Sequence, residues 1–295
     1  MELRRFLAIL TVVLVIILSI VIWFLPPNED FHADNPFWNG LKDISSGYPI
    51  SPLESLADLP QQPQGSTLIL IPYLDFTPAE LERLHGFVTQ GGTLVLADDY
   101  GFGNQVLEYL GLKARFSGQV LLDPLFYYRS RWLPQISHIK SSPVTGDTNS
   151  LTLNHATCLT DVETIDALAL SSVFSFLDLN GNESRDEDEP TGPLPVISQH
   201  NLGSGRIILV SDPSLFINSM ETVEGNRAFI RNIAAVTTAE LLIDQSHLPP
   251  SNLCQTKNLL ASIRGSFGTQ IGAMSLVILV LTITLMPVWQ ERGRR

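Results

Sequence analysis

The chain has 295 residues, a formal net charge of −12 and 44% hydrophobic residues. This length allows one large domain or two modest ones, and the composition suits a folded globular core. The acidic balance argues against nucleic acid as a partner, because phosphate contacts need clustered Lys and Arg.

Two long apolar runs lie near the ends of the chain. Residues 6–25 and 271–288 carry no charge, and each is long enough to cross a bilayer core of about 30 Å. Arg4 and Arg5 precede the first run, and three arginines at 292–295 follow the second. The positive-inside rule therefore predicts a two-pass protein of the cell membrane, with both termini cytoplasmic and residues 26–270 outside. A cleaved signal peptide is the alternative for the first run, but no A-x-A site follows it.

The apolar runs set the predicted division of the chain. In order, we expect a cytoplasmic stub with transmembrane helix 1 (1–25), a linker (26–44), an extracytoplasmic α/β domain (45–250), a second linker (251–270), transmembrane helix 2 (271–288) and a basic cytoplasmic tail (289–295). Cys158 and Cys254 both fall in the outer region. They could form a disulfide there, or remain two unpaired small hydrophobic side chains.

The first part of the domain reads as strand, helix and strand. Residues 66–72 and 93–97 are short apolar runs typical of buried parallel strands. Between them, residues 77–80 (Thr-Pro-Ala-Glu) form a capping box with proline at the first helical position. Apolar residues at helical spacing follow through residue 89. We expect a right-handed βαβ unit, with strand 93–97 near the centre of a parallel-rich sheet.

The periodicity weakens after residue 111 and recovers near residue 195. We expect strands within 114–122, 151–153 and 167–176, a hairpin of 195–199 with 206–211, and a last strand at 240–243. Asn104, Asp212 and Asn226 are each expected to cap the helical segment that follows.

The turn 98–103 (Asp-Asp-Tyr-Gly-Phe-Gly) follows the central strand, where open α/β sheets place their ligands. It has the outline of a nucleophile elbow but contains neither Cys nor Ser. Asp98 and Asp99 could be paired carboxylates for acid–base chemistry, or could cap a helix and solvate a turn. Ser214 could be a nucleophile or simply part of a helix start. His247 could form a site with Asp244 or lie in a surface turn.

Several motifs then carry a family resemblance. The segments TLILIP, TPAELERLHGFVTQGGTLVLADDYGFGN, FSFLDLNGNE, GSGRIILVSDPSLFINSM and NRAFIRNIA resemble archaeal membrane proteins known only as a domain of unknown function. Their ectodomain is similar to the GldG-type and class I glutamine amidotransferase-like fold. The resemblance covers about residues 36–245. It implies a flavodoxin-like sheet between two membrane helices, envelope assembly as a role, and MoxR-type and transglutaminase-like membrane proteins as partners.

The amidotransferase nucleophile is missing from this pattern. Those enzymes carry Cys-x-Gly-x-Gln at the elbow, and residues 101–105 (Gly-Phe-Gly-Asn-Gln) align with it, with Gly101 at the nucleophile position. No His-x-Glu pair follows late in the domain. We therefore expect a non-enzymatic domain that is a structural or ligand-binding part of a membrane complex. The alternative is an extracytoplasmic hydrolase that uses Asp98, Asp99, Ser214 or His247.

Residues 178–189 (DLNGNESRDEDE) fit the calcium-loop pattern D-x-[DN]-x-[DN]-G-x5-E except at position 6, where Glu183 replaces Gly. The pattern predicts that the loop binds Ca²⁺ as a cofactor, with the weak affinity of extracellular calcium sites. Asn182-Glu183-Ser184 is also a glycosylation sequon, and a glycan would remove Asn182 as a ligand. A solvated acidic turn is the other alternative. The expected ligands are Asp178, Asn180, Asn182, the Ser184 carbonyl, Asp186 and Glu189.

Overall fold

The computed structural model describes residues 2–223, 225–268 and 274. It divides the chain into two compact units, which are considered separately. One unit consists of the two terminal segments, 1–27 and 250–295, and the other runs from Asn28 to Pro249.

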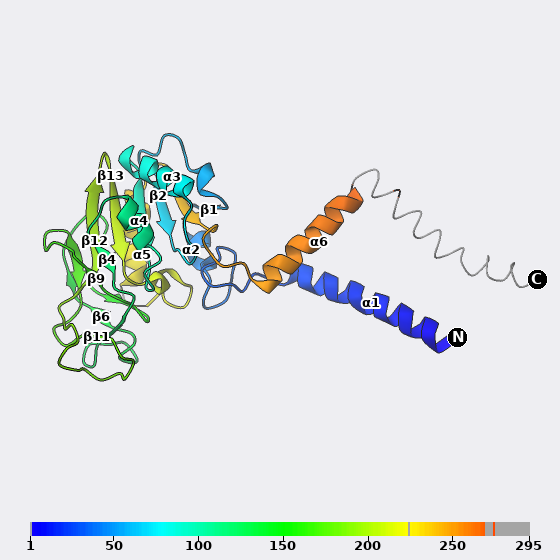
Figure 1. The fold of residues 1–295 in the computed structure, drawn as a ribbon, viewed down its shortest axis with the longest axis horizontal. Helices are drawn as coiled ribbons and strands as arrows, with labels where there is room; N and C mark the ends of the chain where they lie inside the picture. The colour runs from blue at the N-terminus through cyan, green and yellow to red at the C-terminus, as the bar shows by residue number, and fades with distance from the viewer. Residues whose placement is uncertain (1, 224, 269–273, 275–295) are drawn as a thin grey trace, which may run out of the picture. The chain divides into compact units, whose positions relative to one another are not determined.

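The terminal unit contains two helices that contact each other, α1 (Glu2–Phe24) and α6 (Asn252–Gly268) (Figure 1). Helix α6 occupies most of the segment predicted as the second linker. Over the part of the chain that the structure describes, no helix is both long enough and apolar enough to cross a membrane. The predicted second span, 271–288, and the tail after it lie outside the described residues apart from Met274.

The larger unit is built on one eight-stranded sheet with the order β1-β14-β2-β3-β13-β12-β10-β7. The first five of these strands are parallel and the last three are antiparallel. Strand β3 lies between β2 and β13, which confirms the predicted inner position of 93–97 in a parallel-rich α/β sheet. The strands are β1 (Ile50–Leu53), β14 (Leu241–Asp244), β2 (Thr67–Leu70), β3 (Thr93–Ala97), β13 (Gly205–Val210), β12 (Pro195–Leu202), β10 (Ala167–Leu170) and β7 (His138–Ile139).

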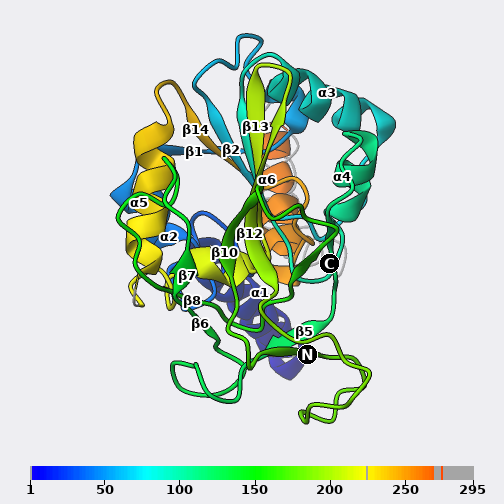
Figure 2. The ribbon, with the colours of Figure 1, turned by 90° about the vertical axis from the view of Figure 1, so that its left-hand side faces the viewer.

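Helices cover both faces of this sheet, as Figure 2 shows. Helices α3 (Pro78–Thr89) and α4 (Asn104–Tyr109) pack on one face, against Leu94, Leu96 and their neighbours. Helices α2 (Lys42–Gly47) and α5 (Asn226–Val236) pack on the other face, against Val95. Because side chains alternate along β3, they pack into two separate apolar cores, one on each face of the sheet.

Three small antiparallel pairs and two 3₁₀ helices complete the unit. The three pairs lie in the segment where the sequence periodicity weakens, and the strands expected at 114–122 and 151–153 are present there only as short pieces. The strand expected at 167–176 is present in part as β10. The elements are β4 (Arg115–Phe116) with β9 (Leu159–Thr160), β5 (Val120–Leu122) with β11 (Phe176–Asp178), β6 (Gln135–Ile136) with β8 (Leu151–Thr152), and the 3₁₀ helices η1 (Leu56–Asp58) and η2 (Pro213–Phe216).

Two of the predicted helix caps are wrong. Asn104 and Asn226 are the first residues of their helices, and each follows a glycine at the cap position. The Asn104 side chain instead bonds the backbone N–H and C=O of Phe116, at 2.8 and 3.0 Å. Asn226 does the same with Thr152, at 2.9 and 2.8 Å. Both amides tie a helix start to a distant strand, a tertiary role that local sequence does not reveal.

Residues 28–44 belong to the compact unit, although the sequence suggested a linker. Phe31, Leu41 and Ile44 are buried. The Gln245 side chain accepts a hydrogen bond from Ala33 N at 2.8 Å and donates one to Phe31 O at 3.3 Å. This segment is therefore fixed beside the end of β14.

Candidate functional site

The parallel strands bring four chain turns to one edge of the sheet. Tyr73 follows β2, Asp98 and Asp99 follow β3, Ser214 follows β13 and His247 follows β14. In open α/β sheets the carboxyl ends of the strands are where ligands bind. The predicted residues therefore converge on the expected edge, but they do not share one site.

A cavity of about 300 Å³ opens at this edge. Its wall contains Asp99 and Ser214 from the predicted set, and neither Asp98 nor His247. Four aromatic rings form much of the remaining wall. The lining residues are Asp30, Phe31, Trp38, Asn39, Tyr73, Asp99, Tyr100, Asn154, His155, Ser214 and Ile217. We call this cavity the edge pocket.

Asp98 holds the turn after β3 in shape. Its carboxylate accepts hydrogen bonds from the backbone N–H groups of Tyr100 (2.9 Å), Gly101 (3.0 Å) and Gly103 (2.6 Å). Gly101 has φ +98°, in the left-handed region that favours glycine. Burial raises the pKa of Asp98 above its usual value although these bonds oppose the change. The geometry supports the turn-capping alternative for Asp98.

Asp99, unlike Asp98, lines the edge pocket. Burial, and then the charge of Asp98, raise the pKa of Asp99 to about 7. Its Oδ1 atom is buried and has no hydrogen-bond partner among the described residues. A buried carboxyl oxygen without a partner is costly for a fold. Such groups gather at functional sites, so Asp99 is the main candidate residue of the pocket.

Asp212 lies directly behind the pocket and is fully buried. It accepts hydrogen bonds from Ser214 N at 2.8 Å and Asn154 N at 2.7 Å. The first bond confirms Asp212 as a cap, here of the 3₁₀ helix η2. Burial, and also the charge of Asp99, hold the pKa of Asp212 well above its usual range. Three acidic groups with raised pKa values, Asp98, Asp99 and Asp212, therefore lie at this edge.

Two pocket residues whose pKa values are shifted, Tyr73 and His155, were missed by the sequence analysis. Burial first, and then the charge of Asp99, raise the pKa of Tyr73 above its ordinary value. Its position just after a predicted strand is a signal that could have identified it. His155 has a left-handed backbone (φ +55°), and burial lowers its pKa. It comes from the weakly periodic segment and carries no such signal.

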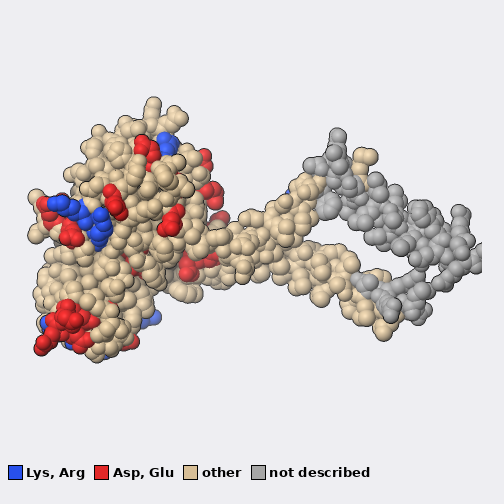
Figure 3. Space-filling model, viewed as in Figure 1, with Lys and Arg blue, Asp and Glu red and all other residues tan. Residues whose placement is uncertain are grey.

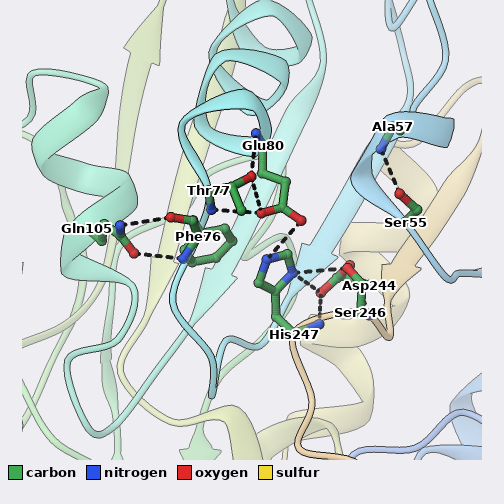
Figure 4. Close-up of polar contacts among 9 residues, drawn as sticks. All are labelled: Ser55, Ala57, Phe76, Thr77, Glu80, Gln105, Asp244, Ser246 and His247. Carbon is green, nitrogen blue, oxygen red and sulfur yellow. Dashed lines mark hydrogen bonds and ion pairs between the residues drawn. The ribbon is translucent and has the colours of Figure 1, made fainter.

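His247 is buried and does not line the edge pocket, so of its two alternatives the surface turn is wrong, and its polar contacts are drawn in Figure 4. Its Nδ1 atom lies 2.9 Å from Asp244 Oδ2, and its Nε2 atom lies 3.8 Å from Glu80 Oε1. The imidazole ring stacks on Phe76 with ring centroids 4.1 Å apart. Both ring nitrogens thus face carboxylates, and the residue links the end of β14 to the start of α3.

The glutamine of the amidotransferase-like pattern has a structural contact. Gln105 Oε1 accepts a hydrogen bond from Phe76 N at 2.9 Å, and its Nε2 donates to Phe76 O at 3.1 Å (Figure 4). This pair fixes the loop before α3. The match at residues 101–105 therefore corresponds to a tight turn and a loop brace, with Gly101 at the position of the nucleophile.

The acidic loop 178–189 is wrapped around the buried carboxylate of Asp178. The two oxygens of Asp178 accept hydrogen bonds from the backbone N–H groups of residues 181–183, at 2.7 to 3.2 Å. Glu183, at position 6, has φ +59°. Calcium loops make a sharp turn with Gly at this position. The turn is therefore formed here even though the side chain is Glu.

The far end of the loop folds back onto its beginning. Glu189 is buried, and its carboxylate accepts hydrogen bonds from Leu179 N at 2.8 Å and Asp186 N at 3.0 Å. Asp186 Oδ2 in turn accepts from the side-chain amides of Asn180 and Asn182, at 2.7 and 2.9 Å. Within the described residues, no three His, Cys, Asp or Glu side chains are grouped to hold a metal. The expected ligand set relies on two Asn side chains and one carbonyl as well as on carboxylates.

Both cysteines are free: Cys158 is buried in the larger unit, and Cys254 lies in α6 of the terminal unit. Burial raises the pKa of the Cys158 thiol to about 12, which keeps it protonated and unreactive.

Comparison with solved structures gives remote likenesses. The chain matches the mmIFT52 N-terminal domain with a TM-score of 0.49 and 17% identity, covering 67% of this chain and 88% of that one. It matches a β-galactosidase from Bacillus circulans sp. alkalophilus (TM-score 0.34, 16% identity, 56% of this chain and 22% of that one). It also matches a putative ThuA-like protein from Bacteroides uniformis, with a TM-score of 0.34 and 12% identity, covering 64% of this chain and 76% of that one.

No curated protein matches the chain. A family model does match, over residues 38–234, and its description is a domain of unknown function, DUF4350. The matched segment contains the turn after β3, the acidic loop and most of helix α5. The chain therefore belongs to the DUF4350 family.

Proposed function

We propose that this protein is a non-enzymatic, membrane-anchored receptor-like component, whose larger unit binds a ligand outside the cytoplasm as part of a membrane complex. The fold would be a divergent GldG-type, amidotransferase-like one. Partners such as MoxR-type and transglutaminase-like membrane proteins, and a role in envelope assembly, follow from the family resemblance alone.

The single observation that carries this proposal is the composition of the edge pocket. A covalent mechanism needs a nucleophile within hydrogen-bond reach of a base. The elbow position holds Gly101, and His247 lies outside the pocket between Asp244 and Glu80. Across the described residues, no hydrogen bond joins Ser214 to His155. A pocket with this lining is suited to binding.

Membrane anchoring is supported by the first apolar run. Helix α1 exposes large hydrophobic side chains along its described length, among them Ile9, Val12 and Phe24. Exposed apolar surface of this extent is unfavourable in water and favourable in a bilayer. The flanking arginines at positions 4 and 5 favour a cytoplasmic N-terminus.

A hydrolase remains the second candidate because one observation favours it. Asp99, with its raised pKa, shares the edge pocket with Ser214 and His155. A carboxyl group with a pKa near 7 is matched to general acid–base catalysis. Of the four residues predicted for a hydrolase, Asp98 and His247 do not line the pocket and would take no part in the reaction.

The two candidates are separated by assaying the purified full chain with glutamine and with p-nitrophenyl acetate. We expect no turnover above that of the variant Ser214→Ala. Hydrolysis by the wild type that is lost in Ser214→Ala, and kept in the control Ser262→Ala on α6, would establish the hydrolase and exclude the binding role.

We also propose that loop 178–189 binds Ca²⁺. Support comes from the turn at Glu183, from the inward folding of Glu189, and from the sequence spacing of oxygen ligands. Oxygen donors suit Ca²⁺ better than a transition metal, which prefers His or Cys. The ion would remove the repulsion among the loop carboxylates.

A further inference from the structure

The edge pocket carries negative charge that nothing inside it balances. Asp30 and Asp99 line it, and among the described lining residues there is no Lys or Arg. Burial lowers the pKa of His155, the remaining group that could become cationic, and so disfavours its charged form. On the face drawn in Figure 3, acidic side chains also gather in more places than basic ones.

The carboxyl group of Asp99 lines the pocket and is short of hydrogen-bond donors. Its Oδ1 atom is buried without a partner, whereas Asp98 beside it accepts three backbone hydrogen bonds. Asp30 already accepts one from the Asn39 amide. A donor that enters the pocket would therefore find its strongest acceptor at Asp99, and a charged donor would gain most.

Aromatic rings surround this acceptor. Tyr73 stacks against Phe31 with centroids 5.6 Å apart and meets Tyr100 edge-on at 5.9 Å. Trp38 and Tyr100 are 68% and 66% exposed, although both line the pocket. The faces of Trp and Tyr rings attract cations, and exposed large aromatic side chains beside carboxylates are typical of sites for organic cations.

We propose that the edge pocket, the binding site of the function proposed above, takes a small ligand bearing a protonated amino group. The ammonium N–H groups bond Asp99, and Trp38 and Tyr100 cover the ligand's alkyl part and its charge. The volume of about 300 Å³ suits a small amine and excludes a folded peptide segment.

The test uses the purified full chain and n-butylammonium chloride as the probe, with binding measured by saturation-transfer NMR at pH 8. Sodium chloride at equal ionic strength is the reference, and 1-butanol is the uncharged analogue. We expect saturable binding of n-butylammonium and none of 1-butanol. Asp99→Asn should weaken binding at least tenfold, whereas Asp58→Asn, at an exposed site outside the pocket, should leave it unchanged. Trp38→Leu should weaken it several-fold and gives a second measure that does not involve the carboxylate.

Each other result has a defined meaning. Equal binding of 1-butanol, or unchanged affinity in both Asp99→Asn and Trp38→Leu, overturns the amine proposal. Binding of glucose in place of n-butylammonium also overturns it but leaves the binding function intact. If no probe binds and the chain hydrolyses p-nitrophenyl acetate, the proposed function fails as well. Binding of tetramethylammonium as tight as that of n-butylammonium would show that N–H donation to Asp99 is not used.

Discussion

At the residue scale, Asp99 links the pH of the medium to the stability of the fold. Its carboxyl has a pKa of about 7 in the folded protein and about 3.9 in an unfolded chain. Between these values the unfolded state has lost the proton and the folded state retains it. The free energy of unfolding therefore falls as pH rises from about 4 to about 7, and the loss remains above pH 7.

Asp99→Asn should remove this loss. A pKa difference of this size corresponds to at most about 4 kcal/mol, and partial solvent contact reduces that figure. We therefore expect the free energy of unfolding of the variant to exceed that of the wild type by about 1–3 kcal/mol at pH 8 and by almost nothing at pH 4. Thermal melts of the two proteins at both pH values measure it. Asp58→Asn is the control: it keeps Asp99, so it should lose stability between pH 4 and pH 8 as the wild type does. An equal gain for Asp99→Asn at pH 4 would mean that charge burial is not the cause.

At the scale of elements, loop 178–189 should respond to calcium. Calcium that binds only the folded state raises the free energy of unfolding by about 2.7 kcal/mol when its free concentration is a hundred times Kd. Millimolar Ca²⁺ should therefore raise the melting temperature, and Asp186→Asn should remove most of the rise. Asp188→Asn alters an exposed carboxylate at a position that is not an expected ligand, and it should keep the rise. If all three proteins melt alike with calcium and with EDTA, the loop is an acidic turn.

The choice of Asp186 for this test follows from the hydrogen bonds of the loop. Asp178 and Glu189 accept backbone N–H groups, at 2.7 Å for Gly181 and 2.8 Å for Leu179. Alanine at either position should lower stability even without calcium, because these partly buried hydrogen bonds to the backbone would be lost. The side chain of Asp186 bonds two exposed amides, so its replacement by Asn perturbs the empty loop little.

Helix α3 depends on its capping box, which the sequence predicts and the structure confirms. Thr77 Oγ1 accepts from Glu80 N, and the Glu80 carboxylate accepts from Thr77 N at 2.8 Å. Thr77→Ala should lower the free energy of unfolding by about 1 kcal/mol. Urea titration measures it, and the m-value should stay unchanged. Thr89→Ala, at the other end of the helix, should cost less because its hydroxyl bonds only carbonyls of its own helix.

At the scale of the whole molecule, the proposed topology can be tested in intact cells. A chain tagged at both ends should be cut within residues 26–270 by added protease, and both tags should be protected, because the arginines at each end favour the cytoplasm. Permeabilised cells should lose the tags as well. Loss of either tag with the middle intact would reverse the orientation and would remove the oxidising, calcium-rich setting assumed for the loop.

The sequence predicted the central elements better than the site. Strand 93–97 and the helix after Thr77 carry strong local signals, namely a continuous apolar run and a capping box, and both are confirmed. Asn104 was misjudged because its partner is a strand residue twelve positions away. The edge pocket combines His155 from an irregular segment with Trp38 from the expected linker, and no pattern in the sequence links these positions.

The pairing of β1 with β14 has a mechanical consequence. These strands lie next to each other in parallel, with four residue pairs in register, and they are the first and last strands of the larger unit. Tension applied between Asn28 and Pro249 would pull them from opposite ends. The four pairs would then slide along one another and resist together, whereas an antiparallel hairpin pulled at one end opens one pair at a time. A domain tethered at both ends would thus carry load along its sheet edge, whereas the pocket residues within 30–39, which precede β1, would be pulled directly.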